Sequence, residues 1–113
     1  STPIKSSAAS DVYKRQEPDS ALDFSNRHLL MQHIRSIVSD GRCALMCIHS
    51  PELALEYCDN ILLMKSGTIL STINTHTDSL DIINEKMSLI YDNINVIECT
   101  DINHKTHRVV VAL

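Results

Sequence analysis

The sequence has 113 residues, of which 43% are hydrophobic and 21% are charged, and its formal net charge at pH 7 is −4. This composition is typical of one small globular domain. No run reaches the roughly 18 apolar residues of a membrane-spanning helix, and Lys and Arg do not cluster as they do on a nucleic-acid-binding surface. The four cysteines form no Cys-x-x-Cys pair, which favours buried, reduced thiols in a cytosolic protein.

Residues 1–16 differ in composition from the rest of the chain. They read STPIKSSAASDVYKRQ, are rich in Ser and Ala, and contain three basic residues and one acidic residue. Such a segment has too little apolar surface to offset the entropy of ordering. The letters SAASDVYKRQ also resemble a translated sequencing adapter, so we expect an artefactual segment; the alternative is a natural, disordered and slightly basic tail. We therefore expect the domain itself at residues 17–113.

The next segment, residues 17–23, reads EPDSALD, and His49 ends an apolar run 26 residues after Asp23. A carboxylate at the mouth of a buried strand, here Glu17, can accept a proton from an attacking water. Pro18 would end that strand because it has no backbone N–H. A lone Glu-Pro pair is usually an exposed turn, and a lone His is usually a surface residue. Only the whole EPDSALD segment together with His49 after an apolar run indicates a catalytic site.

A helix is predicted to follow, with Ser25 as its N-cap and Asn26 as its first residue. Its apolar residues recur at helical spacing on one face: Leu30, Ile34, Ile37 and Val38. Gly41 is the expected C-cap. The run CALMCI at 43–48 is wholly apolar, which is typical of a strand buried on both faces.

After His49, Ser50 and Pro51 predict the N-terminus of a short helix, PELALEYC. The run NILLMKSGTILSTI predicts a β-hairpin that turns at Gly67. A further helix is expected from about Asp78, with one apolar stripe: Leu80, Ile83, Met87, Ile90 and Tyr91. The end, NVIECTDINHKTHRVVVAL, predicts two strands around a polar loop. This order predicts an α/β fold, with parallel strands and helices first, then a β-hairpin, a helix and two C-terminal strands.

These motifs resemble the carboxy-terminal part of the ATP-binding subunit of an ABC transporter. In that family a catalytic Glu-Pro is followed by a D-loop that reads SALD, and a switch histidine ends the next strand. The run HSPELALEYCDNILLMKSGTIL is similar to the family pattern as well. The tail that ends in HRVVVAL is most similar to importers of the iron-siderophore and cobalamin type. The resemblance covers nearly all of residues 17–113 and implies part of a P-loop NTPase domain.

The resemblance also implies roles for individual residues. Glu17 would be the catalytic base, and His49 would contact the γ-phosphate of ATP. Four residues would form the D-loop at a dimer interface: Ser20, Ala21, Leu22 and Asp23. The cofactors would be ATP and Mg²⁺. The partners would be a second ATPase subunit, in a homodimer, and membrane permease subunits, with no nucleic acid. The protein would lie at the cytoplasmic face of the membrane and drive uptake of a solute such as an iron-siderophore complex.

Several family motifs are absent from these 113 residues. No G-x-x-x-x-G-K-[ST] loop is present, and the L-S-G-G-Q signature is missing. Gln16 stands where the family has the Asp that helps to hold Mg²⁺. We therefore expect the chain by itself neither to bind nor to hydrolyse ATP appreciably.

Other functions remain as alternatives. The chain could come from an ABC ATPase of another substrate class, could be a non-catalytic α/β interaction domain, or could be a fragment with no function of its own. A metal site built from Cys99, His104 and His107 is disfavoured because H-x-x-H fits no known zinc pattern. Ser20 is not expected to be a nucleophile, since no G-x-S-x-G surrounds it.

Overall fold

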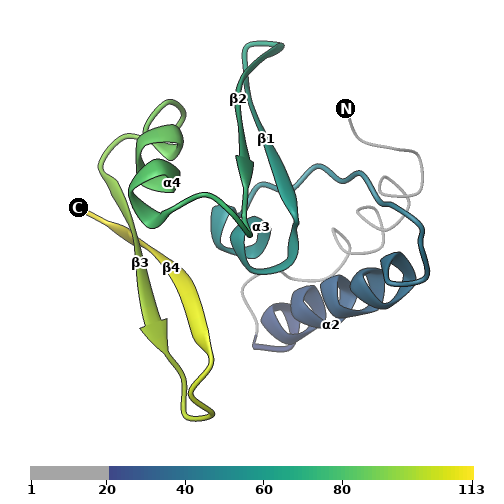
Figure 1. Cartoon of the computed structure of the whole chain (residues 1–113). Helices are drawn as coiled ribbons and strands as arrows, with labels where there is room; N and C mark the ends of the chain where they lie inside the picture. Colours follow the sequence, from purple (N-terminus) through teal and green to yellow (C-terminus); the bar gives the residue numbers. More distant parts are fainter. Residues whose placement is uncertain (1–20) are drawn as a thin grey trace. The chain divides into compact units, whose positions relative to one another are not determined.

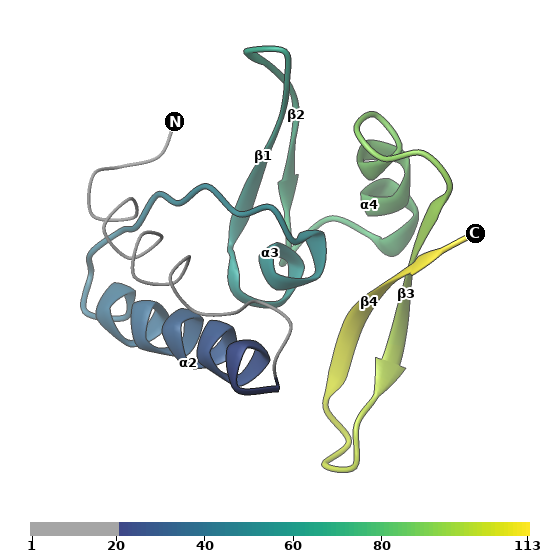
Figure 2. The ribbon, with the colours of Figure 1, turned by 180° about the vertical axis from the view of Figure 1, so that it is seen from behind.

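The structure, a computed structural model, describes residues 21–113. The chain divides into two compact units, Ser1–His49 and Ser50–Leu113, each of which is treated by itself. In the described part of the first unit, residues 21–49, the chain forms the helix α2 (Figure 1). The second contains α3, the β1–β2 hairpin, α4 and the β3–β4 hairpin, seen from the opposite side in Figure 2. No helix in the described part of the chain has both the length and the hydropathy to cross a membrane.

Helix α2 spans Ala21–Val38, so it begins earlier than predicted. Ala and Leu favour helix, and Asp23 lies in the first turn, where the helix dipole favours a negative charge. The Asp23 carboxylate also lies 3.7 Å from the Arg27 guanidinium one turn later. These local preferences make Ser25 part of the helix, and the predicted N-cap is wrong.

The predicted end of α2 is confirmed. Gly41 has a φ of +84°, the left-handed conformation that a glycine C-cap adopts, and its N–H donates to the Val38 carbonyl at 3.1 Å. Among the apolar side chains that the structure describes at positions 23–38, Met31 is buried, whereas Ile37 from the predicted stripe is 38% exposed. The apolar face is therefore centred slightly away from the predicted one.

Residues 43–48, predicted to be a buried strand, form no strand, and that prediction is wrong. Cys43, Leu45 and Cys47 are exposed, as is Cys99, which also corrects the expectation of buried thiols. A central strand needs a partner at each edge and cover on each face. Within residues 21–113 the two sheets have two strands each, and both pairs are antiparallel. The expected parallel strands are therefore not found there.

The second unit follows the sequence prediction closely. Helix α3 spans Pro51–Tyr57, and its N-cap Ser50 accepts a hydrogen bond from the Leu53 N–H at 3.3 Å. The first hairpin pairs β1, Asn60–Lys65, with β2, Thr68–Asn74. Both turn residues have positive φ, +53° at Ser66 and +76° at Gly67, as a two-residue type I′ turn requires.

The remaining elements are also those predicted. Helix α4 spans Leu80–Met87, and its N-cap is Ser79, whose hydroxyl accepts from the Ile82 N–H at 3.3 Å. Strands β3, Ile94–Thr100, and β4, Thr106–Ala112, pair in an antiparallel hairpin around the polar loop. Of the predicted stripe, Leu80, Ile83 and Met87 lie on α4, where Ile83 has no exposed surface. The helix ends at Met87, so Ile90 and Tyr91 lie beyond it, although both still pack against the core.

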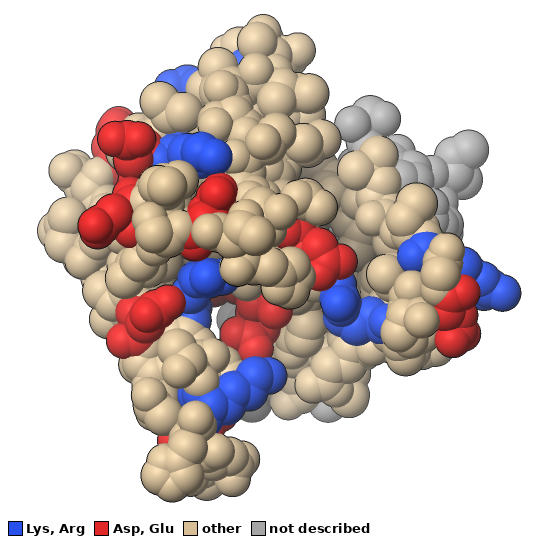
Figure 3. All heavy atoms as spheres, in the orientation of Figure 1, with Lys and Arg blue, Asp and Glu red and all other residues tan. Residues whose placement is uncertain are grey.

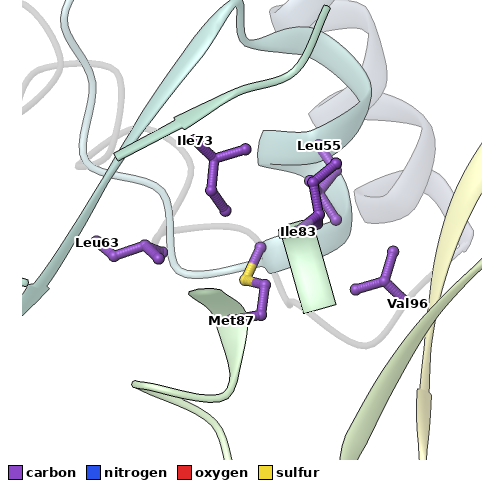
Figure 4. Packing of buried hydrophobic residues seen from close by; sticks show 6 residues of the cluster. All are labelled: Leu55, Leu63, Ile73, Ile83, Met87 and Val96. Atoms are coloured by element: carbon purple, nitrogen blue, oxygen red, sulfur yellow. The ribbon is translucent and has the colours of Figure 1, made fainter. Parts of the chain in front are cut away.

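Six side chains from five elements form the core of the second unit (Figure 4): Leu55, Leu63, Ile73, Ile83, Met87 and Val96. A two-stranded hairpin is only marginally stable alone in water. Helix α4 lies between the two hairpins and packs against β2 and β3 (Figures 1 and 2). The two small sheets thus share one core through α4, which holds the unit together.

Asn84 of α4 adds a polar connection to this packing. The Val96 N–H donates to its side-chain oxygen at 2.7 Å, and its side-chain nitrogen donates to the Val96 carbonyl at 2.9 Å. The same nitrogen donates to the Leu80 carbonyl at 3.2 Å. The amide of Asn84 therefore pairs with β3 much as a neighbouring strand would, and it attaches β3 to α4.

We expect Asn84→Ala to lower the free energy of unfolding by about 1–3 kcal/mol, because both backbone groups of Val96 lose a partner in a half-buried place. Urea titration followed by circular dichroism measures the change. Asn103→Ala, which removes an exposed amide from the β3–β4 loop, is the control and should change stability by less than about 0.5 kcal/mol. Equal effects of the two substitutions would contradict this role of Asn84.

Candidate functional site

The structure describes only part of the predicted ATPase site. Glu17 and Ser20 lie outside the described residues. Ala21, Leu22 and Asp23, the rest of the predicted D-loop, form the first turn of α2. Asp23 is 2% exposed and lies beside Arg27. The described residues therefore place this end of the motif at a helix N-terminus, while its roles and the domain start at residue 17 stay predictions.

His49 lies where the sequence predicts it in the chain, between the apolar run at 43–48 and the capped helix α3. Its side chain is exposed. The next residue, Ser50, is held as the N-cap of α3, and this fixes the backbone just after His49. An exposed imidazole beside a fixed backbone can reach a ligand from solvent. Contact with a phosphate remains a prediction.

The charged side chains of the described part are mixed in sign. In Figure 3, Lys and Arg lie next to Asp and Glu across the visible face, and no large area of that face carries one sign. Several of these neighbours form ion pairs, such as Lys86 with Asp78 at 3.2 Å. The Asn74 backbone N–H, and then Lys86, donate hydrogen bonds that lower the pKa of Asp78.

One polar cluster joins three elements of the second unit. On β4, His107 Nε2 lies 2.6 Å from Asp101 Oδ2, and its Nδ1 lies 3.1 Å from Glu56 Oε1. Asp101 directly follows β3, and Glu56 belongs to α3. The hydrogen bond to Asp101, and next the one to Glu56, raise the pKa of His107. The hydrogen bond from His107, and next that from the Lys105 N–H, lower the pKa of Asp101.

This cluster is not a metal site. The two carboxylates lie at opposite nitrogens of the imidazole ring, so the three groups do not converge on one point. Cys99 lies opposite His107 in the strand ladder, and its side chain is exposed. No group of three His, Cys, Asp or Glu side chains within residues 21–113 is arranged to hold a metal ion.

The sequence analysis did not find this cluster. Asp101 and His107 are six residues apart across a predicted hairpin loop, and this spacing could have indicated that the two side chains lie close together. Glu56 is 51 residues away from His107 and lies in a different predicted element. Only the packing of α3 against β4 brings it there.

Comparison with known proteins gives several curated relatives. The hemin import ATP-binding protein HmuV of Pseudomonas entomophila is 43% identical over 51 residues, which cover 45% of this chain and 20% of that protein. HmuV of Burkholderia ambifaria is 36% identical over 56 residues, 49% of this chain and 20% of the relative. HmuV of Plesiomonas shigelloides is 37% identical over 62 residues, 55% of this chain and 24% of the relative.

The resemblance to an ABC transporter ATP-binding subunit is confirmed. The chain spans about a fifth of the length of the curated relatives it matches first. No protein-family model matches the chain, and no solved structure matches it. The relatives thus support a partial ABC importer ATPase, whereas the activity of a whole protein is a matter for proposal.

Proposed function

We propose that this sequence is part of the ATP-hydrolysing subunit of an ABC importer, with the P-loop NTPase fold. The observation that carries the proposal is the combination of EPDSALD and the exposed His49 before a capped helix, in a chain whose relatives are hemin import ATP-binding proteins. In this proposal residues 17–113 are the carboxy-terminal part of the nucleotide-binding domain.

The proposed site residues act on water and on phosphate. Bound ATP would supply the γ-phosphoryl group, with its charge partly neutralised by Mg²⁺. Glu17 would accept the proton of the attacking water, and His49, which is exposed, would donate a hydrogen bond to a phosphate oxygen. The sequence has no phosphate-binding loop and has Gln16 at the Mg²⁺ position. The main ligands of ATP and Mg²⁺ are therefore not among these residues, and we derive no further step from them.

The proposed partners follow from the same resemblance. The D-loop, residues 20–23, would face a second ATPase subunit in a homodimer, and permease subunits would bind the dimer at the cytoplasmic face of the membrane. The solute class is a metal chelate. The names of the relatives favour hemin as the solute over the iron-siderophore complex expected from the tail of the sequence.

A chimera tests this function. Residues 17–113 would replace the matching part of the Pseudomonas entomophila relative, expressed with the permease of that host. We expect the chimera to hydrolyse ATP and to drive hemin uptake into membrane vesicles, because its host part supplies the phosphate loop. The unmodified host protein is the positive control. A folded chimera that binds ATP but does not hydrolyse it would contradict the proposal and would favour a non-catalytic interaction domain.

A further inference from the structure

The contacts of His107 depend on its protonation state for a geometric reason. Both ring nitrogens face a carboxylate oxygen, Asp101 at 2.6 Å and Glu56 at 3.1 Å. An imidazolium has two N–H donors and can serve both oxygens, whereas a neutral imidazole has one N–H donor and one lone pair. When the ring is neutral, one nitrogen lone pair must face a carboxylate, and that contact becomes repulsive.

The carboxylates of Asp101 and Glu56 are not equally free to move away from the His107 ring. Asp101 is held in the hairpin loop, where its Oδ1 accepts hydrogen bonds from the N–H groups of Asn103 at 2.7 Å and Lys105 at 3.0 Å. Its backbone N–H also donates to the Lys105 carbonyl at 2.9 Å. Glu56 belongs to another element, α3, and makes the longer of the two contacts. The neutral ring should therefore keep Asp101 and lose Glu56.

Few other charged groups face this cluster. From the hairpin loop, Lys105 Nζ lies 3.9 Å from Glu56 Oε2, and its side chain is 68% exposed, so it is a weak link between the same elements. From β3, Cys99 is the ladder partner of His107. The second carboxylate of α3, Glu52, is exposed in the first turn. Glu56 is thus the charged group of α3 that contacts His107.

We propose that His107 is a proton-dependent clamp that fastens α3 to the β3–β4 hairpin. The protonated ring binds Asp101 and Glu56 together and holds the two elements in place. The neutral ring stays with Asp101, and α3 is held to the hairpin by apolar packing and by Lys105. The clamp lies within the second unit and does not depend on the proposed ATPase function.

The pH range over which the clamp is closed follows from the direction of the pKa shifts of His107 and Asp101. The pKa of His107 is raised above its ordinary 6.5, so its contribution is complete below about pH 6.5 and is lost as the pH rises through the raised value. The pKa of Asp101 is lowered from its ordinary 3.8, so its contribution is complete above that pH and is lost as the pH falls through the lowered value. The clamp is therefore closed in mildly acidic solution and opens toward alkaline pH.

Nuclear magnetic resonance of the full 113-residue chain tests the clamp. A titration from acidic to alkaline pH would follow the His107 ring and the backbone amides of α3, together with amide hydrogen exchange. We expect His107 to titrate above the ordinary histidine value and the amides of α3 to shift with the same midpoint. Once the ring is neutral, the protection of these amides, relative to their intrinsic exchange rate at the same pH, should fall severalfold.

Glu56→Gln should abolish the coupled change in α3, because by turning its side chain an uncharged amide can accept from Nδ1–H of the charged ring or donate to the Nδ1 lone pair of the neutral ring. Glu52→Gln, on an exposed position of the same helix, is the matched control and should keep the coupling. His107→Gln should leave α3 independent of pH over this range and serves as a second variant. An ordinary pKa for His107, or a titration of His107 to which the α3 amides do not respond, would overturn the clamp.

Discussion

Replacing Glu17 by Gln in the chimera should lower the rate of ATP hydrolysis by roughly 10²- to 10⁴-fold, the usual contribution of one general acid–base group. Glutamine keeps the size and the hydrogen bonding of the side chain but cannot take the proton from water. ATP binding should persist, and ATP should accumulate in a stable dimer because turnover no longer resolves the closed state. Turnover is measured beside nucleotide affinity. Near-normal turnover would show that Glu17 is not the base and that the motif is misaligned.

Two further substitutions in the chimera distinguish the proposed roles. His49→Ala should reduce hydrolysis by deleting a phosphate contact, and its exposed position argues against a large loss of stability. Asp23→Ala should weaken communication across the dimer while ATP affinity stays nearly intact. Because Asp23 also lies 3.7 Å from Arg27 in the first turn of α2, Arg27→Ala is the control for a merely local effect.

Replacing Ile83 by Ala should destabilise the second unit by about 2–5 kcal/mol, the range for a buried aliphatic side chain cut back to alanine. Ile83 has no exposed surface and lies in the cluster of Figure 4, on the helix that both hairpins share. That loss is a large part of the 5–15 kcal/mol that stabilises a typical small protein. Denaturant unfolding of the full chain, followed by circular dichroism, measures it.

The neighbouring residue offers a matched control. Ile82 is on the same helix and has the same side chain, but it is 41% exposed. Ile82→Ala should therefore have a much smaller effect, well under that of Ile83→Ala. Similar losses at both positions would mean that α4 does not connect the two hairpins through one buried face.

Local chemistry in the sequence was enough to predict most of the second unit. Ser50 and Pro51 begin α3, and the Ser66–Gly67 turn forms the first hairpin, because caps and tight turns depend on residues close together in the chain. The buried stripe of α4 was predicted for a similar reason, since helical periodicity already states which face is apolar. The EPDSALD motif and His49 likewise indicated the ABC resemblance that the relatives confirm.

Contacts between distant residues could be decided only by the tertiary structure. The run at 43–48 has the composition of a central strand. A strand forms only where another strand is hydrogen-bonded to it, and none of the strands in the described part of the chain pairs with this run. Glu56 reaches His107, and Asn84 reaches Val96, because α3 and α4 pack against the last hairpin. Composition and periodicity predict which face of a helix or strand is apolar. The partner of a polar side chain depends on which elements that apolar face brings together.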